Sequence, residues 1–210
     1  MINKPYSESC EQNKTPILSV LKQYLIKPDS LVLEIGSGTG QHACYFSQKL
    51  PHLHWQPSEQ VENIPDVQAW TEELLAKPSC VQNILPTIKL DVAQAQWPTL
   101  SVDYVFSANT LHIMYWKEVE LMIQGIRQIL KPDGLFCVYG PFNYNGQYTS
   151  ESNARFDQWL KTRDPKSGIR DFEALCHLGH IPSANNPLSL LEDHEMPANN
   201  RLLIFKSQGD

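Results

Sequence analysis

Three glycines stand two residues apart directly after a short apolar segment, at Gly36, Gly38 and Gly40. Residues 31–35 form the apolar segment, which is typical of a strand buried on both faces, and residues 41–50 favour a helix. Glycine lets the backbone turn tightly and approach a ligand closely. The dinucleotide fingerprint G-x-G-x-x-G needs a third glycine at position 41, where this chain has Gln41. The spacing therefore predicts a ligand-binding turn and makes a nicotinamide oxidoreductase the remote alternative.

Glu34 stands two residues before the first glycine and completes the pattern E-x-G-x-G-x-G. This pattern resembles the first motif of the class I S-adenosylmethionine-dependent methyltransferases. The resemblance implies that the cofactor is S-adenosyl-L-methionine and that the turn, including Ser37, lies against its methionine part. It also implies that Glu34 supports the turn by organising the hydrogen bonds of the site. A tight turn that binds no ligand is the alternative.

The same superfamily has acidic residues after its second and third strands, and this chain has a candidate for each. Glu59 follows the second expected strand, with Ser58 beside it as the second choice. The resemblance implies that Glu59 binds the ribose diol, because a carboxylate can accept from two hydroxyl donors. After the third strand, Asp91 would accept from the adenine amino group and Val92 would supply a backbone N–H. A solvated loop glutamate and a turn-forming aspartate are the respective alternatives.

A fourth strand is expected over residues 102–107, and it is followed by Asn109, Leu111 and His112. In the superfamily that the chain resembles, this strand end carries the residues nearest the sulfonium and the incoming substrate. Open α/β sheets hold their ligands at the carboxyl ends of the strands. We therefore expect Asn109 and Leu111 to bind the cofactor. His112 is expected as a catalytic base, since histidine titrates near neutral pH. A structural histidine or a cofactor-packing residue is the alternative.

Four short segments resemble the methyltransferase-like 26 family, and the likeness runs over most of the chain. The segments are Pro5-Tyr6-Ser7, Asn13 before Pro16-Ile17-Leu18, Gly38-Thr39-Gly40-Gln41-His42-Ala43 and Trp55-Gln56-Pro57-Ser58. Members of that family are assigned as methyltransferases by fold, so the resemblance leaves the acceptor open. Glu59 departs from the family, whose typical member has Asp at this place. We expect the N-terminal segment, with Asn13, to close over the cofactor, and a mobile tail is the alternative.

The segment after the fifth expected strand, residues 141–150, is rich in tyrosine and in side-chain amides. It follows the expected position of the methyl group, and its side chains suit a small polar or aromatic acceptor. Tyr144 is expected to act there as a second catalytic residue beside His112. A helix expected over residues 152–161 continues this lid. An ordinary surface loop with satisfied amides is the alternative.

Helical and strand patterns alternate along the chain, which implies a parallel sheet with right-handed crossovers. Thr15 before Pro16 is expected to cap the first helix, and Lys131-Pro132-Asp133-Gly134 is expected to be a stop and turn. The remaining expected elements are helices over 63–75, 118–130 and 171–178, and strands over 53–56, 87–91, 135–139, 188–191 and 201–206. The predicted fold is α/β, a Rossmann-like class I methyltransferase fold whose mostly parallel seven-stranded sheet has an antiparallel edge strand and helices on both faces. We expect one methyltransferase domain over residues 1–210, with an N-terminal cover (1–30), a cofactor-binding half (31–140) and a substrate-side part (141–210).

The composition fits a globular protein of 210 residues, with 17 basic and 23 acidic side chains and a net charge of −6. The charge disfavours a nucleic-acid partner, because an excess of Lys and Arg is missing. No stretch approaches 18 apolar residues and Met1–Cys10 is polar, so neither a membrane span nor a secretory signal is expected. Five widely spaced cysteines without a C-x-x-C motif favour neither disulfides nor zinc. We expect no metal site and a cytoplasmic location.

These features together predict transfer of a methyl group from S-adenosyl-L-methionine to a small-molecule acceptor by direct displacement. Two alternatives stay open. One is a non-catalytic cofactor-binding or scaffold protein of the same fold, and the other is a methyltransferase that acts on RNA or protein. The acceptor atom and the oligomeric state are left open as well.

Overall fold

The computed structural model describes residues 4–94, 96–180 and 186–209. None of the helices in these ranges is long and apolar enough to span a membrane. In chain order, the elements are α1 (Glu8–Tyr24), β1 (Ser30–Ile35), α2 (Gln41–Lys49), β2 (Leu53–Glu59), α3 (Ile64–Leu75), β3 (Ile88–Lys89), β4 (Val102–Ala108), α4 (Trp116–Ile129), β5 (Leu130–Gly140), β6 (Phe142–Asn143), α5 (Glu151–Arg163), β7 (Arg170–Asp171), α6 (Phe172–Gly179), β8 (Leu188–Met196), a 3-10 turn (Pro197–Asn199) and β9 (Asn200–Ser207).

Seven strands form a mixed sheet in the order β3-β2-β1-β4-β5-β9-β8. β1 pairs in parallel with both β2 and β4, and β2 pairs in parallel with β3. β9 is antiparallel to both of its neighbours, β5 and β8. The predicted α/β class, with a mostly parallel seven-stranded sheet and an antiparallel pair at one edge, is confirmed.

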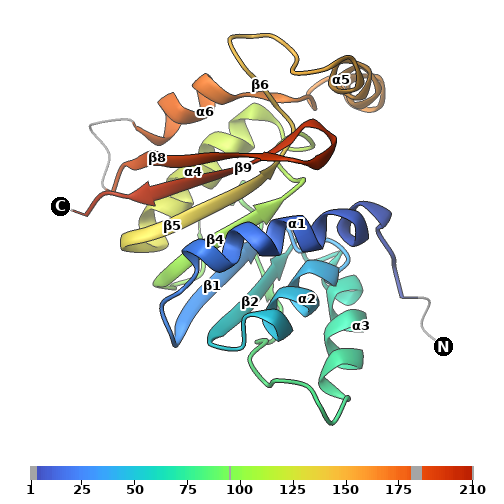
Figure 1. Cartoon of the computed structure of the whole chain (residues 1–210), viewed down its shortest axis with the longest axis vertical. Helices are drawn as coiled ribbons and strands as arrows, with labels where there is room; N and C mark the ends of the chain where they lie inside the picture. The colour runs from blue at the N-terminus through green and yellow to red at the C-terminus, as the bar shows by residue number, and fades with distance from the viewer. Residues whose placement is uncertain (1–3, 95, 181–185, 210) are drawn as a thin grey trace. The chain divides into compact units, whose positions relative to one another are not determined.

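The chain divides into two compact units, Met1–Asp91 with Val102–Ser107, and Val92–Ser101 with Ala108–Asp210. In the first unit α1, α2 and α3 lie side by side against β1 and β2 (Figure 1). Its core is aromatic, since the ring of Phe46 on α2 lies 5.5 Å from Trp55 of β2 and 5.4 Å from Phe106 of β4. All three rings are buried. This packing holds α2, and the glycine turn before it, against the strands.

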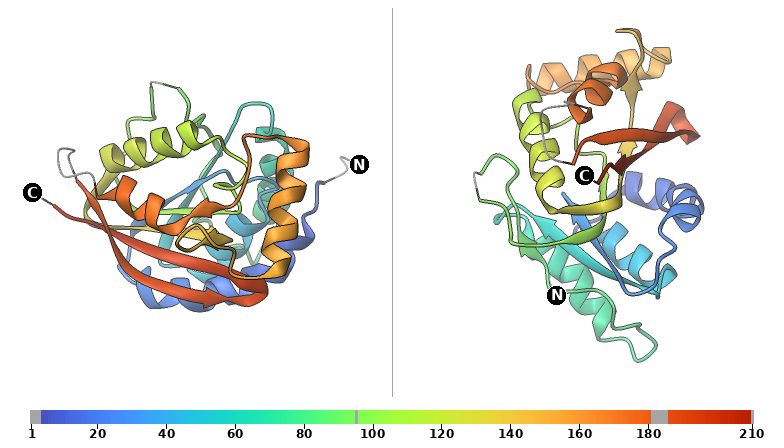
Figure 2. Two further views of the ribbon diagram at one scale, coloured as in Figure 1. Left: turned by 90° about the horizontal axis from the view of Figure 1, so that it is seen from above. Right: turned by 90° about the vertical axis from the view of Figure 1, so that its left-hand side faces the viewer.

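The second unit contains β5, β9 and β8 together with α4, α5 and α6. β8 and β9 form a long antiparallel hairpin (Figure 2). A short parallel pair, β6 with β7, joins the segment after β5 to the start of α6. The helix expected over residues 118–130 is present as α4, which buries one apolar face: Val119, Met122, Ile123, Ile126 and Ile129.

The first helix begins well before its predicted start, and the prediction that Thr15 caps it is wrong. The cap is Ser7, whose Oγ accepts a hydrogen bond of 3.3 Å from the amide of Cys10. Pro16 therefore lies inside the helix, where it has no N–H to donate. Packing outweighs this loss, because the helix buries Ile17 and Leu21 completely. Ser and Thr are both favoured at the N-cap, and the longer helix that begins after Ser7 also buries Asn13.

Three further boundaries differ from the expected ones. β5 begins at Leu130, so the predicted stop and turn at residues 131–134 lies inside a strand, where Asp133 has a φ of 61°. The strand expected over residues 87–91 is only two residues long, as β3. The expected loop over residues 141–150 contains β6, which pairs with β7.

Candidate active site

The glycine turn between β1 and α2 has a left-handed backbone at each of its glycines. The φ angles are 72° at Gly36, 56° at Gly38 and 86° at Gly40. The amide of Gly40 donates to the carbonyl of Ser37 at 2.8 Å and so closes the turn. The amide of Ser37 donates to the carbonyl of Ser58 at 3.0 Å and fixes the turn to the end of β2. Glycine is needed here because other residues rarely adopt these angles.

Glu59, the last residue of β2, is hydrogen-bonded to the glycine turn. Its Oε2 accepts from the amide of Gly38 at 2.7 Å, and its Oε1 accepts from the amide of Gln60 at 2.9 Å. The residue is only 8% exposed. Each carboxylate oxygen still has a further lone pair, so two hydroxyl donors can bind beside the turn. The structure thus brings together Gly38 and Glu59, which the sequence predicted for one ligand.

Ser58, the second choice for the ribose, lies fully buried beneath the turn. Its Oγ donates to the carbonyl of Glu34 at 2.6 Å, and its amide donates to Oγ of Ser37 at 3.2 Å. These two bonds tie β1, β2 and the turn into one rigid corner. The position of Ser58 suits support of the turn, and its predicted contact with the cofactor stays a prediction.

Glu34 is a buried carboxyl group, only 2% exposed, in the middle of this corner. The indole Nε1 of Trp55 donates to its Oε2 at 2.8 Å. Burial raises the pKa of Glu34 to about 8, and the charge of Glu59 adds to this, while hydrogen bonds from Trp55 and Ser37 act in the opposite direction. Neither Glu34 nor Glu59 forms an ion pair with a residue that the structure describes. The corner therefore holds two buried acids without a cation.

Asn13 lies on α1 and reaches the first turn of α2. Its Oδ1 is 2.6 Å from Nε2 of His42, and both side chains are buried. Burial, together with the charge of Lys14, lowers the pKa of His42 to about 4, so its ring is neutral near pH 7. The predicted contact of Asn13 with the cofactor stays a prediction. What the structure shows is a polar link between α1 and the helix that follows the glycine turn.

The N-terminal segment is bound to α2 and α3 over its described length. The amide of Ser7 donates to Oε1 of Gln41 at 2.5 Å, and Nε2 of Gln41 returns a bond of 3.3 Å to the carbonyl of Ser7. Further along, Nε1 of Trp70 donates to the carbonyl of Pro5 at 2.6 Å. The Lys4 ammonium lies 3.6 Å from the centre of the Trp70 ring. The segment is therefore docked beside the turn, and closure over a cofactor stays a prediction.

The predicted adenine residues follow β3. The amide of Leu90 donates to the carbonyl of Glu59 at 2.9 Å, which holds the chain just before Asp91 next to the end of β2. Asp91 is half-buried and Val92 is buried. Asp91 thus lies next in sequence to a residue bonded to Glu59, as a shared ligand would require, and its role stays a prediction.

His112 lies in the second unit, on the loop after β4. In this loop Asn109 has a φ of 59° and its amide donates to the carbonyl of Tyr139 at 2.9 Å, while Leu111 is buried. The ring of His112 is 7% exposed and lies edge-on to Phe156, with 5.2 Å between ring centres. Neither ring nitrogen has a hydrogen-bond partner among the described residues. Because no described group is bonded to these nitrogens, the imidazole is available to a polar ligand.

The pKa of His112 is lowered to about 4, first by burial and then by the charge of Arg170. The ring is therefore neutral near pH 7 and able to accept a proton or a hydrogen bond.

Tyr144, the second predicted catalytic residue, lies in the same unit and follows β6 directly. Its hydroxyl donates to Oδ2 of Asp193 at 2.8 Å, and its ring stacks on Phe172 with 4.8 Å between centres. Burial raises its pKa, and the hydrogen bond to Asp193 raises it further. No hydrogen bond or ring contact joins Tyr144 to His112 within the described chain. The catalytic role of Tyr144 stays a prediction.

Three residues that shape these regions were not singled out from the sequence as site residues: Gln41, Trp55 as the partner of Glu34, and Arg170. Gln41 and Trp55 belong to two of the segments that resemble the methyltransferase-like 26 family, and this resemblance could have pointed to them. Arg170 bonds to the backbone of the His112 loop, with Nε donating to the carbonyl of Leu111 at 2.9 Å. Every residue has a backbone carbonyl group, so the sequence could not predict which carbonyl Arg170 binds.

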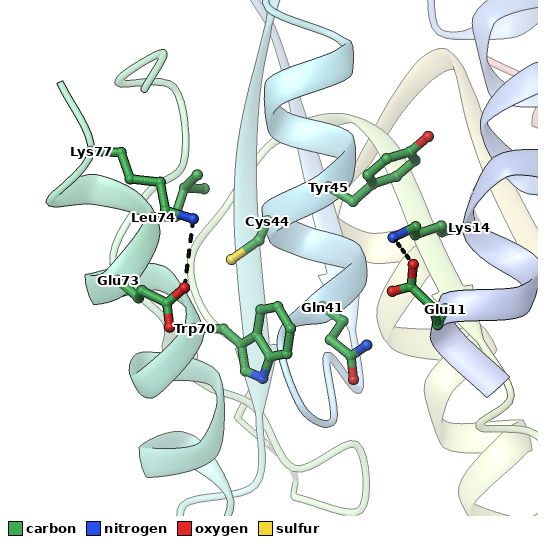
Figure 3. Close-up of a pocket in the computed structure, with 9 residues that line it drawn as sticks. All are labelled: Glu11, Lys14, Gln41, Cys44, Tyr45, Trp70, Glu73, Leu74 and Lys77. Atoms are coloured by element: carbon green, nitrogen blue, oxygen red, sulfur yellow. Dashed lines mark hydrogen bonds and ion pairs between the residues drawn. The ribbon is translucent and has the colours of Figure 1, made fainter. Parts of the chain in front are cut away.

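A cavity of about 160 Å³ opens on the helix side of the first unit, between α1, α2 and α3 (Figure 3). Cys44 and Trp70 line it, and the ion pairs Glu11–Lys14 and Glu73–Lys77 lie at its two sides. None of the predicted cofactor residues lines it. The described chain also contains no cluster of three or more His, Cys, Asp or Glu side chains that could hold a metal ion.

The glycine turn gives a testable difference between two of its residues. A Cβ at Gly40 would lie 3.0 Å from Cα and 3.1 Å from the carbonyl oxygen of Val67, whereas a Cβ at Gly38 would meet nothing within 4 Å. We expect Gly40→Ala to lower the free energy of unfolding by about 3 kcal/mol and Gly38→Ala by about 1 kcal/mol. Urea denaturation measures both values. Equal losses would contradict the close packing of the turn against α3.

Several solved structures that share this arrangement of strands and helices are described as methyltransferases. An O-methyltransferase family protein from Burkholderia thailandensis matches with a TM-score of 0.78 at 12% identity, over 96% of this chain and 58% of that one. Human N-acetylserotonin methyltransferase, solved in complex with SAM, matches with a TM-score of 0.73 at 15% identity, over 97% of this chain and 53% of that one. An O-methyltransferase family 2 protein from Planctomyces limnophilus, solved with apigenin, matches with a TM-score of 0.74 at 13% identity, over 94% and 59%.

These likenesses define the fold class, which is the Rossmann-like methyltransferase fold. The chain spans only 53% to 59% of the length of the three proteins. Within this class, the chain belongs to the family described as "Protein of unknown function (DUF938)", which it matches over residues 4–207.

Proposed function

We propose that this protein is an S-adenosyl-L-methionine-dependent methyltransferase that transfers a methyl group to a small-molecule acceptor by direct displacement. The observation that carries the proposal is the bond between the Gly38 amide and the Glu59 carboxylate. It joins the glycine turn to an acidic strand end, in a corner that also contains a second buried acid, Glu34. This combination suits a cationic ligand that also has hydroxyl donors.

The residues present fit the proposed cofactor. Glu59 is a buried carboxyl group without a described cation and suits a ligand with a sulfonium and an ammonium group. Glu34, whose pKa is about 8, can ionise when a cation binds next to it. The space beside Cα of Gly38 is open, so a ligand can approach the backbone there. When bound, S-adenosyl-L-methionine supplies an activated methyl group on its sulfur.

On the cofactor side, most of the proposed roles belong to residues of the first unit. Glu59 accepts from the ribose hydroxyls through the lone pairs that its two amide donors leave free. Gly36, Ser37, Gly38 and Gly40 line the methionine part, with Glu34 and Ser58 beneath them and Asn13 toward α1. Asp91 and Val92 bind the adenine edge. Asn109 and Leu111 are proposed as further cofactor contacts.

On the acceptor side, His112 is the proposed base. Its ring nitrogens lack described partners, and its low pKa keeps it neutral. A base with so low a pKa is most effective when the proton that it removes is itself acidic. Tyr144 is proposed to contact the acceptor from the segment after β5. The neighbours named above include O-methyltransferases, which supports a hydroxyl acceptor.

Finer assignments are also proposals. The segments that resemble the methyltransferase-like 26 family contact one another in the structure, since Ser7 bonds to Gln41 and Asn13 to His42. This supports membership of that family and one working domain over residues 1–210. The five cysteines are free thiols, which supports a reducing compartment such as the cytoplasm.

Calorimetric titration with S-adenosylhomocysteine, the cofactor product, tests the proposal. We expect saturable binding of one ligand per chain, at the micromolar level that is usual for cofactor sites. A titration of the folded protein without any heat of binding, repeated at two temperatures, would contradict the proposal. Binding without turnover over a broad panel of acceptors would instead favour a non-catalytic cofactor-binding protein.

A further inference from the structure

Asp157 on α5 is a buried carboxylate, 1% exposed, that accepts three hydrogen bonds. Its Oδ2 accepts from the hydroxyl of Tyr148 at 2.7 Å and from the ammonium of Lys161 at 2.6 Å, and its Oδ1 accepts from the amide of Ile169 at 2.7 Å. Burial alone would raise the pKa of Asp157, but these donors together hold it below its usual value. Asp157 is therefore an ionised group whose geometry is fixed from three sides.

The residues around Ile169 hold the loop that carries His112. Four consecutive carbonyl groups of this loop, those of residues 111–114, accept hydrogen bonds from the segment 167–170. Arg170 donates to Leu111 at 2.9 Å and also to Met114, the amide of Gly168 donates to His112 at 2.8 Å, and Oγ of Ser167 donates to Ile113 at 3.3 Å. The backbone position of His112 is thus set by the segment that Asp157 binds.

The close approach of α5 to this segment depends on Gly168. A Cβ there would lie 2.9 Å from Oδ1 of Asp157 and 3.1 Å from Cε of Lys161. Phe156, the residue before Asp157, packs against the ring of His112. One turn of α5 therefore contacts both the side chain of His112 and the segment that holds its backbone.

We propose that Asp157 is the positioning residue of the acceptor side, and that its carboxylate fixes His112 through the segment 167–170. The inference rests on the proposed function, in which His112 faces the acceptor. Asp157 touches neither the cofactor nor the acceptor in this account. It keeps the imidazole desolvated and in one orientation, as a base that must meet a small acceptor requires.

The test is a pH titration of the cofactor-free Asp157→Asn variant, in which NMR signals report the pKa of His112. Asn has one acceptor oxygen where Asp has two, so it cannot accept from Tyr148 and Lys161 on one side and from the amide of Ile169 on the other. We therefore expect the segment 167–170 to loosen and water to reach the ring. We expect the pKa of His112 to rise from about 4 toward 6.5, its ordinary value, and the Gly168 amide to exchange faster.

The matched control is Asp193→Asn, in the same unit. Asp193 accepts from Tyr144 at 2.8 Å and from Nε of Arg201 at 2.7 Å. Within the described residues, it is not bonded to the segment 167–170 or to the His112 loop. We expect this variant to lose stability while the pKa of His112 stays unchanged. If both variants lose stability and neither changes the pKa of His112, Asp157 only holds the fold together and the proposal is wrong.

A milder variant covers the case in which Asp157→Asn does not fold. Lys161→Met removes one donor from Asp157 at a side chain that is 54% exposed. We expect a smaller rise in the pKa of His112 and faster exchange at Gly168, and no change in either would overturn the proposal. Calorimetry with S-adenosylhomocysteine on the same proteins keeps the two ideas apart, because the His112 measurements need no cofactor.

Discussion

Replacement of Gly38 by arginine is expected to abolish cofactor binding and leave the protein folded. A Cβ added at Gly38 would meet nothing within 4 Å, so the new side chain starts in open space. It instead fills the space in which a ligand must approach the turn and the carboxylate of Glu59. We expect affinity for S-adenosylhomocysteine to fall by about 100-fold or more, the loss of close contact at the centre of a binding site.

Gly146→Arg is the control for this substitution, because Gly146 has the same local properties. It has a φ of 69° and also nothing within 4 Å of an added Cβ. Both variants should lose about 1 kcal/mol of stability from the strained backbone. Only Gly38→Arg should lose the ligand in a calorimetric titration. Equal affinities in the two variants would place the cofactor away from the glycine turn.

Glu34→Gln is expected to remove a strong pH dependence of stability. The pKa of Glu34 is about 8 in the folded protein against 4.5 in the unfolded chain. Between these values the folded protein binds more protons than the unfolded chain, so this group stabilises the fold at low pH. That stabilisation is lost as pH rises through about 8. The change across this window is on the order of 4 kcal/mol.

Urea denaturation of both proteins at pH 5 and at pH 8.5 measures this effect. Other groups titrate equally in the two proteins, so the difference between them isolates Glu34. Near pH 5 the variant should be about as stable as the native protein, because glutamine resembles a protonated carboxyl group. At pH 8.5 the variant should be the more stable one. A difference that does not change with pH would mean that Glu34 is ionised when folded.

The glycine turn was predictable because its signals are local. The apolar segment 31–35, the three glycines and the helix after them are adjacent in the chain, and each has a steric reason to be where it is. The place of Glu59 beside the turn could be predicted for a related reason, because the parallel strands β1 and β2 bring their carboxyl ends together. The predicted parallel sheet followed from the alternation of strands and helices along the chain.

The acceptor side was harder to predict because its partners are far apart in sequence and involve backbone groups. Arg170 binds carbonyl oxygens of residues 111 and 114, and any residue has a carbonyl. The hydroxyl of Tyr144 donates a hydrogen bond to Asp193, which lies far along the chain on β8. The start of α1 was misjudged because Ser7 and Thr15 are both good caps, and only tertiary packing decides between them. Features that depend on adjacent residues could be predicted from the sequence, whereas contacts between residues far apart in the chain could not.

In the proposed function, the glycine turn and Glu59 together bind S-adenosyl-L-methionine. The most direct test follows the backbone amide of Gly38 by NMR while S-adenosylhomocysteine is added, because this amide donates to Oε2 of Glu59 at 2.7 Å. We expect a saturable shift of the Gly38 signal, with a midpoint equal to the calorimetric affinity. Saturation of the ligand with the Gly38 signal unmoved would contradict the proposed function.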